Sequence, residues 1–258
     1  MSKKYTYKEY TSSDTLYKKY SVYQARYADN IRESDRVLIN MVKDIVQNSE
    51  PLKQTLLDIG CSTGNLLDNI RQSAPDVKLT GGDLMANVIA ECKQNKSLAG
   101  IDFKIMDILN LPDSAKFDII VANAVSVYFE ENEYDRAIKS VSGALEPDGW
   151  FIGFEWIHEF RQALKITETS RSHPDGLTIF FRPMEFIEGV LKKHGFADIQ
   201  FRPFQIPIDL KKGQTYGNNE DGFEDLNSYT VKMEENKRML FRGALFQPWC
   251  HFMARKEK

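Results

Sequence analysis

Strand-like and helix-like patterns alternate along residues 54–155 of the chain. Short apolar runs, which are typical of buried parallel strands, are separated by stretches with apolar residues at helical spacing. The runs expected to be strands cover residues 55–59, 77–81, 102–106, 117–122 and 150–155, and the expected helices cover 65–73, 85–95 and 131–145. Strands separated by helices predict a parallel sheet that is covered on both faces.

The N-terminal flank is expected to be helical. Residues 31–48 carry apolar side chains at helical spacing, and the pattern stops just before Pro51. Tyr20, Tyr23 and Tyr27 also recur at helical spacing and give one helix face an aromatic character. Such a face either packs into the core or closes over a ligand, and both interpretations stay open at this point.

The alternation changes after residue 155. A helix is expected over residues 157–172, then a turn at 173–176 and an amphipathic helix over 183–194. A sixth strand over 197–208 contains two prolines, which suits an edge strand or a bent strand. The remaining expected elements are a polar loop at 211–225, a hairpin formed by 229–233 and 238–245, and a final strand at 246–254.

Composition narrows the classes of function. The chain has 258 residues and a net charge of -3. We therefore expect no nucleic-acid partner, because proteins that bind nucleic acid usually carry a broad basic surface. Its three cysteines have neither paired nor zinc-type spacing, which predicts no disulfide framework and no metal site. There is no apolar N-terminal region and no run of membrane-spanning length. We therefore expect a cytoplasmic protein without a membrane partner.

The most informative chemical motif lies in residues 56–67. An apolar run contains Asp58, glycines at positions 60 and 64 form a tight loop, and a helical pattern follows. Such a loop brings backbone N–H groups close to a bound ligand. Dinucleotide-binding enzymes need Gly-x-Gly-x-x-Gly here, because their pyrophosphate sits on the helix N-terminus, and this chain lacks that motif. A nucleoside cofactor without phosphate fits the loop better.

Further polar residues follow the next three strands at the same edge of the expected sheet. Asp83 lies roughly 20 residues after the loop, where an acid accepts hydrogen bonds from ribose hydroxyls. Asp107, next to Ile108, can accept from an adenine amino group, or it can simply cap the following turn. Asn123 and Ala124 follow the fourth strand, at the carboxyl edge where ligands of open α/β sheets bind.

These motifs, in this order, resemble the class I S-adenosylmethionine-dependent methyltransferases. The matching segments are residues 57–64, 82–84, 106–108, 117–123 and 145–150, so the resemblance covers roughly residues 30–155. It implies an α/β fold with three layers and a Rossmann-like, seven-stranded, mostly parallel sheet. The last strand would be antiparallel and inserted between strands five and six. The family's middle loop glycine is Ser62 here, which adds a Cβ where backbone and ligand approach.

The resemblance also implies the cofactor and the residues that hold it. The cofactor would be S-adenosyl-L-methionine, with S-adenosyl-L-homocysteine as its product. Asp58 and the loop glycines would hold the methionine end, Asp83 the ribose and Asp107 the adenine edge. The complete set of expected cofactor-binding residues is Asp58, Gly60, Cys61, Ser62, Gly64, Asp83, Leu84, Asp107, Ile108, Asn123 and Ala124.

The acceptor end of the site is less well marked in the sequence. Methyl transfer requires mainly alignment, because the sulfonium is already an activated donor. A base is needed only where the acceptor must lose a proton. Glu155 and His158, just past the fifth strand, are the candidate bases, although His158 also suits a structural role. The residues expected at the acceptor or in a lid are Tyr20, Tyr23, Arg26, Tyr27 and Tyr128.

We interpret residues 1–48 as an N-terminal helical lid and residues 49–258 as a methyltransferase domain, with acceptor-site insertions at 156–190 and 211–245. The expected acceptor is a small molecule, with O- or N-methylation preferred over C-methylation. Two alternatives stay open: an enzyme that uses S-adenosylmethionine to make a modified cofactor, and a non-catalytic protein that binds it. The sequence also leaves open whether the protein is a monomer or a homodimer.

Overall fold

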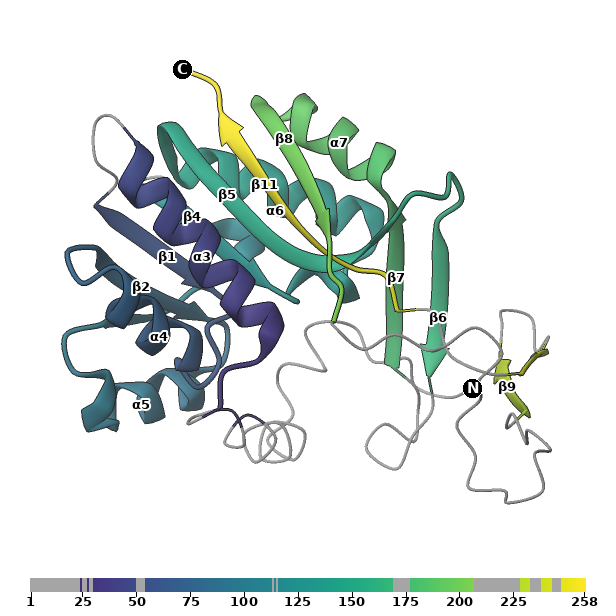
Figure 1. Cartoon of the computed structure of the whole chain (residues 1–258), viewed down its shortest axis with the longest axis horizontal. Coiled ribbons are helices and arrows are strands. Elements are labelled where there is room, and N and C mark those ends of the chain that lie inside the picture. The colour runs from purple at the N-terminus through teal and green to yellow at the C-terminus, as the bar shows by residue number, and fades with distance from the viewer. Residues whose placement is uncertain are drawn as a thin grey trace.

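A mixed sheet forms the centre of the molecule (Figure 1). The computed structural model describes residues 24, 27, 30–49, 54–112, 114, 116–168, 177–206, 228–232, 238–242 and 247–258. Along its main path the strand order is β3-β2-β1-β4-β5-β11-β8. These strands are β1 (Thr55–Ile59), β2 (Lys78–Asp83), β3 (Asp102–Ile105), β4 (Phe117–Asn123), β5 (Leu145–His158), β8 (Phe196–Pro203) and β11 (Trp249–Lys256).

The strand directions confirm the fold class expected from the sequence. Strands β1 to β5 pair with one another in parallel, as strands joined through crossover helices do. The last strand, β11, is antiparallel to both of its neighbours, β5 and β8. It therefore lies between β5 and β8, which are the fifth and sixth strands of the main path in chain order. Strand β8 forms the edge of the sheet, as the proline in this segment indicated.

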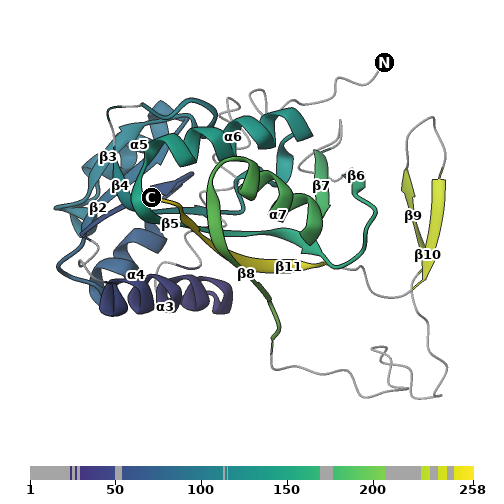
Figure 2. The same cartoon turned by 90° about the horizontal axis from the view of Figure 1, so that it is seen from above.

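Helices cover both faces of the sheet (Figure 2). The helices α3, α4 and α5 share one apolar cluster, and α6 and α7 share another on the opposite face. Their bounds are α3 (Glu33–Asn48), α4 (Asn65–Ser73), α5 (Ala86–Gln94), α6 (Glu131–Ala144) and α7 (Met184–Lys193). Short 3-10 turns η1 (Lys96–Leu98), η2 (Ile108–Asn110) and η3 (Ser126–Tyr128) connect several of these elements.

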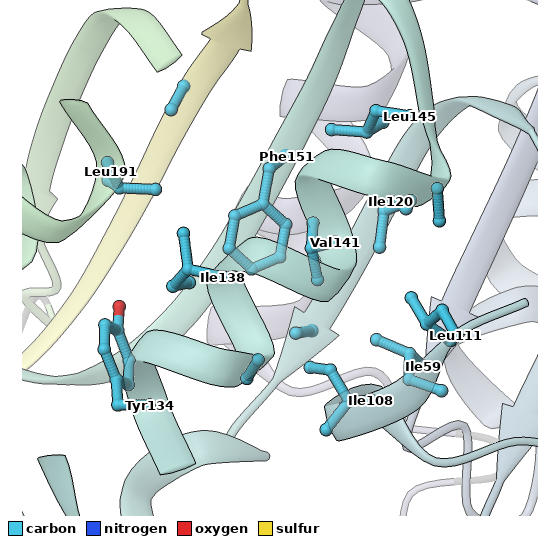
Figure 3. Packing of buried hydrophobic residues seen from close by; sticks show 14 of the residues in the cluster. Ile59, Ile108, Leu111, Ile120, Tyr134, Ile138, Val141, Leu145, Phe151 and Leu191 are labelled. Carbon is cyan, nitrogen blue, oxygen red and sulfur yellow. The ribbon is translucent and has the colours of Figure 1, made fainter. Parts of the chain in front are cut away.

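Alternating strand residues supply the two cores. On the α6 side, Ile120 and Phe151 lie against Ile138 and Val141 of the helix (Figure 3). The intervening strand residues, such as Ile152, face the cluster that contains α3. Because both faces are buried, the central strands read as nearly continuous apolar runs, which is why the sequence located them well.

The expected helix over residues 157–172 is wrong. Strand β5 continues to His158, and β6 (Leu164–Glu168) follows it. A further strand, β7 (Leu177–Pro183), pairs antiparallel with β6 and in parallel with the end of β5. The run Leu-Thr-Ile-Phe-Phe at the start of β7 is rich in β-branched and aromatic residues, which favour strands. The amphipathic helix expected after it is confirmed as α7.

The hairpin expected near the C-terminus is confirmed by β9 (Ser228–Lys232) and β10 (Arg238–Arg242), which pair antiparallel. The polar loop expected at residues 211–225 lies outside the described residues, as does most of the segment before residue 30. None of the helices in the described part of the chain is long and apolar enough to cross a membrane.

Gly153 of β5 gives a direct test of this packing. A Cβ at this position would overlap the ring of Phe252, which is fully buried in β11 and packs edge-on against Phe151. We expect Gly153→Ala to lower the free energy of unfolding by about 1–3 kcal/mol, because the overpacked ring cannot move freely. Denaturant unfolding measures this change. Gly189→Ala in α7 is the control: no atom lies within 4 Å of its added Cβ. Equal losses in the two variants would contradict the packing described here.

Candidate functional site

The Gly-rich loop after β1 is fixed against the end of β2. The backbone N–H groups of Gly60 and Cys61 donate to the carbonyl oxygen of Gly82, at 2.7 and 3.0 Å. Gly64 N–H donates back to the Cys61 carbonyl at 2.9 Å and closes the loop just before α4. The loop therefore has a defined shape at the carboxyl edge of the parallel strands, where ligands of α/β folds bind.

Backbone conformation explains the two glycines. Gly60 and Gly64 have φ angles of 80° and 79°, in the left-handed region that favours glycine. A Cβ on Gly60 would lie 2.5 Å from Cγ2 of Val125, so the loop also packs too closely for a side chain. Ser62 adopts a φ of 48° in the same region. The serine in place of the family's glycine therefore keeps the loop shape, at a cost in backbone strain.

Asp58, near the end of β1, carries a buried carboxyl group. Its side chain is 2% exposed, and its Oδ1 atom has no hydrogen-bond partner among the described residues. The pKa of Asp58 is raised from 3.8 to about 8, chiefly by burial and also by the nearby charges of Asp35 and Asp83. A cation placed beside Asp58 would remove this penalty.

Asp83 connects the loop to β2. Its Oδ2 atom accepts from the N–H of Ser62 at 3.1 Å, and its Oδ1 atom accepts from the N–H of Met85 at 3.0 Å. Burial raises the pKa of Asp83, and the backbone N–H donors of Met85, Ser62 and Leu84 oppose that shift. The carboxylate thus sets the distance between the loop and the start of α5.

Asp107 caps the turn that follows β3. Its Oδ1 atom accepts from the N–H of Leu109 at 2.9 Å, so the capping alternative considered from the sequence is present in the structure. This contact uses one of the two carboxylate oxygens. Ile108, the residue beside it, is almost fully buried.

Asn123 and Ala124 lie at the end of β4, as expected. The Asn123 side chain donates from Nδ2 to Oδ1 of Asp35 at 3.0 Å. Asp35 belongs to the first turn of α3, is 6% exposed and also forms an ion pair with Arg32, with 2.7 Å between Nε and Oδ2. Ala124 has a φ of 58°, which turns the chain sharply after the strand.

The sequence analysis missed Asp35. One signal was available: Asp35 lies three residues before Leu38, on the face of the amphipathic helix that should be buried. An acid on a buried face requires a partner or a function. The hydrogen-bond partner of Asp35 could not be predicted from the sequence, because Asn123 is 88 residues away along the chain.

Glu155 lies in a buried polar network behind the loop that follows β4. Its carboxylate accepts from the hydroxyl of Ser126. Arg182 of β7 donates to the carbonyl of Ser126 at 3.1 Å and to that of Phe129. Burial raises the pKa of Glu155, while the guanidinium of Arg182 and the Ser126 hydrogen bond lower it. Glu155 and Arg182 together hold the turn η3 in place.

His158 lies at the end of β5, beyond the point where that strand leaves the edge of β4. It is 2% exposed, and its ring packs 5.5 Å from that of Phe160. Burial lowers the pKa of His158, so the imidazole is neutral at pH 7. The backbone carbonyl groups of Phe181 and Phe160 lie near the ring and oppose this shift of the pKa. Within the described residues neither ring nitrogen makes a hydrogen bond of good geometry.

Part of the expected lid contacts the loop region. The carbonyl oxygen of Gln24 accepts from Nδ2 of Asn65, the first residue of α4, at 3.0 Å. Tyr27 is half-buried, and its ring lies 5.3 Å from the guanidinium carbon of Arg32. Tyr128 is half-buried in η3. The other expected lid residues, Tyr20, Tyr23 and Arg26, lie outside the described residues.

Comparison with known proteins identifies the domain. A family model described as "Methyltransferase domain" matches residues 56–149. Residues 56–149 belong to this family, and the fold around them is that of the class I S-adenosylmethionine-dependent methyltransferases. The match covers the strands β1 to β4 and the start of β5, which carry the loop and all three acids at the sheet edge.

Individual relatives are distant. The chain is 29% identical over 135 residues to a malonyl-[acyl-carrier protein] O-methyltransferase of Haemophilus ducreyi, covering 48% of this chain and 52% of that one. It is 20% identical over 187 residues to a ubiquinone/menaquinone biosynthesis C-methyltransferase of Desulfotalea psychrophila, covering 63% and 73%. The chain spans about half the length of the curated malonyl-[acyl-carrier protein] relatives it matches.

A solved structure with the same fold is that of CalS10, an amino pentose methyltransferase from Micromonospora echinaspora bound to S-adenosylmethionine. The TM-score is 0.56 with 16% sequence identity, and the match covers 91% of this chain and 96% of CalS10. At this identity the likeness extends to the fold and not to the acceptor. Among the residues that the structure describes, no group of His, Cys, Asp and Glu side chains is arranged to hold a metal ion.

Asp58→Asn should stabilise the protein in the absence of ligand. The carboxyl group ionises near pH 4 when the chain is unfolded but near pH 8 when it is folded, so ionisation favours unfolding as the pH rises through this window. We expect the melting temperature of the variant to exceed that of the wild type by about 3 °C or more at pH 7.5, and by progressively less toward pH 4.5. Thermal unfolding at several pH values measures this difference.

Asp102→Asn is the matched control for that experiment. Asp102 lies on the exposed start of β3 and pairs only at the surface, with Lys104. Its variant should melt within about 1 °C of the wild type at pH 7.5, because a surface pair contributes little to stability. A melting temperature of Asp58→Asn that is lower than that of the wild type at pH 7.5 would contradict the burial of an uncompensated charge.

Proposed function

We propose that this chain transfers the methyl group of S-adenosylmethionine to an oxygen or nitrogen atom of a small-molecule acceptor. The observation that carries the proposal is the buried carboxyl group of Asp58 at the edge of a glycine loop, whose Oδ1 atom has no hydrogen-bond partner among the described residues. The amino-acid end of S-adenosylmethionine carries an ammonium group beside a carboxylate, and the adjoining sulfonium adds a second positive charge. A cationic ligand of this kind relieves the electrostatic penalty on Asp58.

The other residues at the edge fit the rest of the cofactor. The loop can keep this shape only with glycine at positions 60 and 64, because a Cβ would meet Val125 or Leu98. A carboxylate offers about four acceptor positions, so Asp83 retains acceptor capacity for a ribose hydroxyl beyond the backbone donors of Ser62, Met85 and Leu84. We assign the free oxygen of Asp107 to the adenine amino group, with Leu84 and Ile108 beside the ring. When bound, the cofactor supplies an activated methyl group.

Aromatic side chains near the ends of β5, β7 and β11 support a small and largely apolar acceptor. The rings of Trp156 and Phe181 lie 4.4 Å apart, and Trp249 is 5.1 Å from Trp156. Trp156 Nε1 is buried with no hydrogen-bond partner among the described residues, and so suits a polar atom of the acceptor. Tyr128 packs against the same cluster.

We propose different roles for the two candidate bases. Glu155 is a positioning residue, because its carboxylate already holds the Ser126 hydroxyl and faces Arg182. His158 is the candidate base, because a neutral imidazole can accept a proton on a ring nitrogen. Transfer to a nucleophile that carries no proton would require neither residue. The relatives include enzymes named for both O- and C-methylation, so product analysis must decide the atom methylated.

Binding of the product nucleoside tests the assignment directly. Isothermal titration calorimetry should detect S-adenosylhomocysteine binding to the wild type, and Asp83→Asn should weaken it about 10- to 100-fold, through loss of charged hydrogen bonds to the ribose. Asp102→Asn is the matched surface control and should bind as the wild type does. Circular dichroism checks that Asp83→Asn remains folded. Binding of NAD in place of both sulfur nucleosides would exclude the proposal.

The pH dependence of binding tests Asp58 separately. Only the ionised carboxylate attracts an ammonium group, and the pKa of Asp58 is about 8 before binding. We therefore expect S-adenosylmethionine affinity to fall as the pH decreases below 8, and binding at pH 7 to release protons. Calorimetry in buffers with different ionisation enthalpies measures the release. Asp58→Asn should abolish most of it; an unchanged release would assign the proton to Asp83, whose pKa burial also raises.

Two further measurements separate the alternatives. Mass spectrometry of nucleoside that copurifies with the protein distinguishes S-adenosylmethionine from a modified cofactor. Transfer of labelled methyl groups to a panel of small acceptors distinguishes an enzyme from a binding protein. A nucleoside of unexpected mass, or tight binding without transfer to any acceptor, would favour the corresponding alternative.

A further inference from the structure

Two buried thiols converge beneath the glycine loop. Cys61 lies in the loop and Cys92 in α5, and they are 5% and 4% exposed. Both thiols contact the same acceptor, the carbonyl oxygen of Ser62, with Sγ–O distances of 3.9 Å for Cys61 and 3.1 Å for Cys92. Core cysteines usually pack as small apolar residues. These two thiols differ from such core cysteines because both S–H groups are directed at one backbone atom, the carbonyl oxygen of Ser62 in the glycine loop.

The electrostatics of the pair make the two thiols unequal. The neighbouring Cys61 thiol lowers the pKa of Cys92, whereas the contact with Cys92 and burial raise the pKa of Cys61. The carboxylates of Asp58 and Asp83 raise the pKa of both thiols, and Glu91 that of Cys92. Cys92 therefore forms a thiolate more readily than Cys61 does. Cys61 is the thiol that can then react with the oxidised sulfur of Cys92.

We propose that Cys61 and Cys92 form a redox site in which peroxide converts the two thiols into a disulfide and thereby weakens cofactor binding. The first half of this inference concerns only the two cysteines, and the second half rests on the proposed function. Peroxide is the oxidant class considered because it is small enough to reach a thiol with a few per cent of its surface exposed.

The chemistry balances in two steps. The Cys92 thiolate attacks one oxygen of hydrogen peroxide, forms a sulfenic acid and releases hydroxide. Cys61 then attacks the Cys92 sulfur; the S–S bond forms, the S–O bond breaks, and the departing hydroxide takes the Cys61 proton as water. In total, two thiols and one peroxide give one disulfide and two waters. A dithiol reductant reverses the oxidation.

The disulfide would act on the loop through Ser62. At present both S–H groups stabilise the Ser62 carbonyl, while its N–H donates to Asp83. Oxidation removes both S–H donors and draws Cys61 toward α5. Since Ser62 already has a strained φ of 48°, losing these contacts releases it from its present geometry. The contact between the loop and Asp83 changes with it, and so does the cofactor cradle.

The test uses the full reduced chain and a peroxide titration. We expect the intact mass to fall by about 2 Da, with loss of two free thiols and recovery of a peptide that links Cys61 to Cys92. S-adenosylhomocysteine affinity should decrease at least about tenfold and return after treatment with dithiothreitol. A chain that keeps its thiols, or that goes directly to sulfinic acid, would overturn the redox site. A disulfide that leaves affinity unchanged would overturn its coupling to the cofactor.

Two variants complete the experiment. Cys92→Ser retains a hydroxyl donor for the Ser62 carbonyl, should fold normally and should lose the response to peroxide. Cys250→Ser removes the third cysteine, whose thiol donates to the His251 carbonyl in β11, and should respond as the wild type does. Equal responses in both variants would overturn the pairing. If the reduced chain binds no sulfur nucleoside, the proposed function fails, whereas the mass and peptide measurements still decide whether the disulfide forms.

Discussion

The buried carboxyl group of Asp58, whose ionisation is disfavoured, is the constraint on which the site depends. The carboxyl group lies at the end of the central strand β1, nearly inaccessible to water, with two further acids close enough to raise its pKa. An apolar residue at the same position would avoid the cost of burying a carboxyl group. A buried carboxyl group of this kind is expected where a bound ligand supplies a positive charge. The protein without that ligand is then less stable than it would be with an uncharged residue at this position.

The elements around Asp58 form one connected support. Asp35 of α3 holds Asn123 at the end of β4, and so joins the N-terminal helix to the sheet edge. Arg182 of β7 holds the turn after β4 through two carbonyl groups, and Val125 at the start of that turn packs against Gly60. Strand β7 is thereby linked to the glycine loop by two contacts. A change at β7 can therefore reach the glycine loop without passing through the core of the sheet.

Sequence patterns located the elements whose signals are local. The apolar runs of β1 and β4 and the glycines of the loop follow from residues adjacent in the chain, so their positions were correct within one or two residues. The strands β6 and β7 were missed because they depend on pairing with each other and with the extended end of β5. Tertiary pairing of this sort overrides the helical tendency of residues 157–168. Likewise, the contacts that define the roles of Asp35 and Glu155 join residues far apart in the sequence.

Ser62 shows how a departure from a family pattern can be accommodated. A serine in the left-handed region costs more than a glycine, so the conformation must be fixed by its surroundings. Here the N–H of Ser62 is bound by the Asp83 carboxylate, and its carbonyl oxygen receives the thiols of Cys61 and Cys92. These contacts make the shape of the loop dependent on an acid and on two thiols, where a glycine would need neither. The same substitution therefore accounts for both the retained cradle and its sensitivity to the protonation and oxidation of its neighbours.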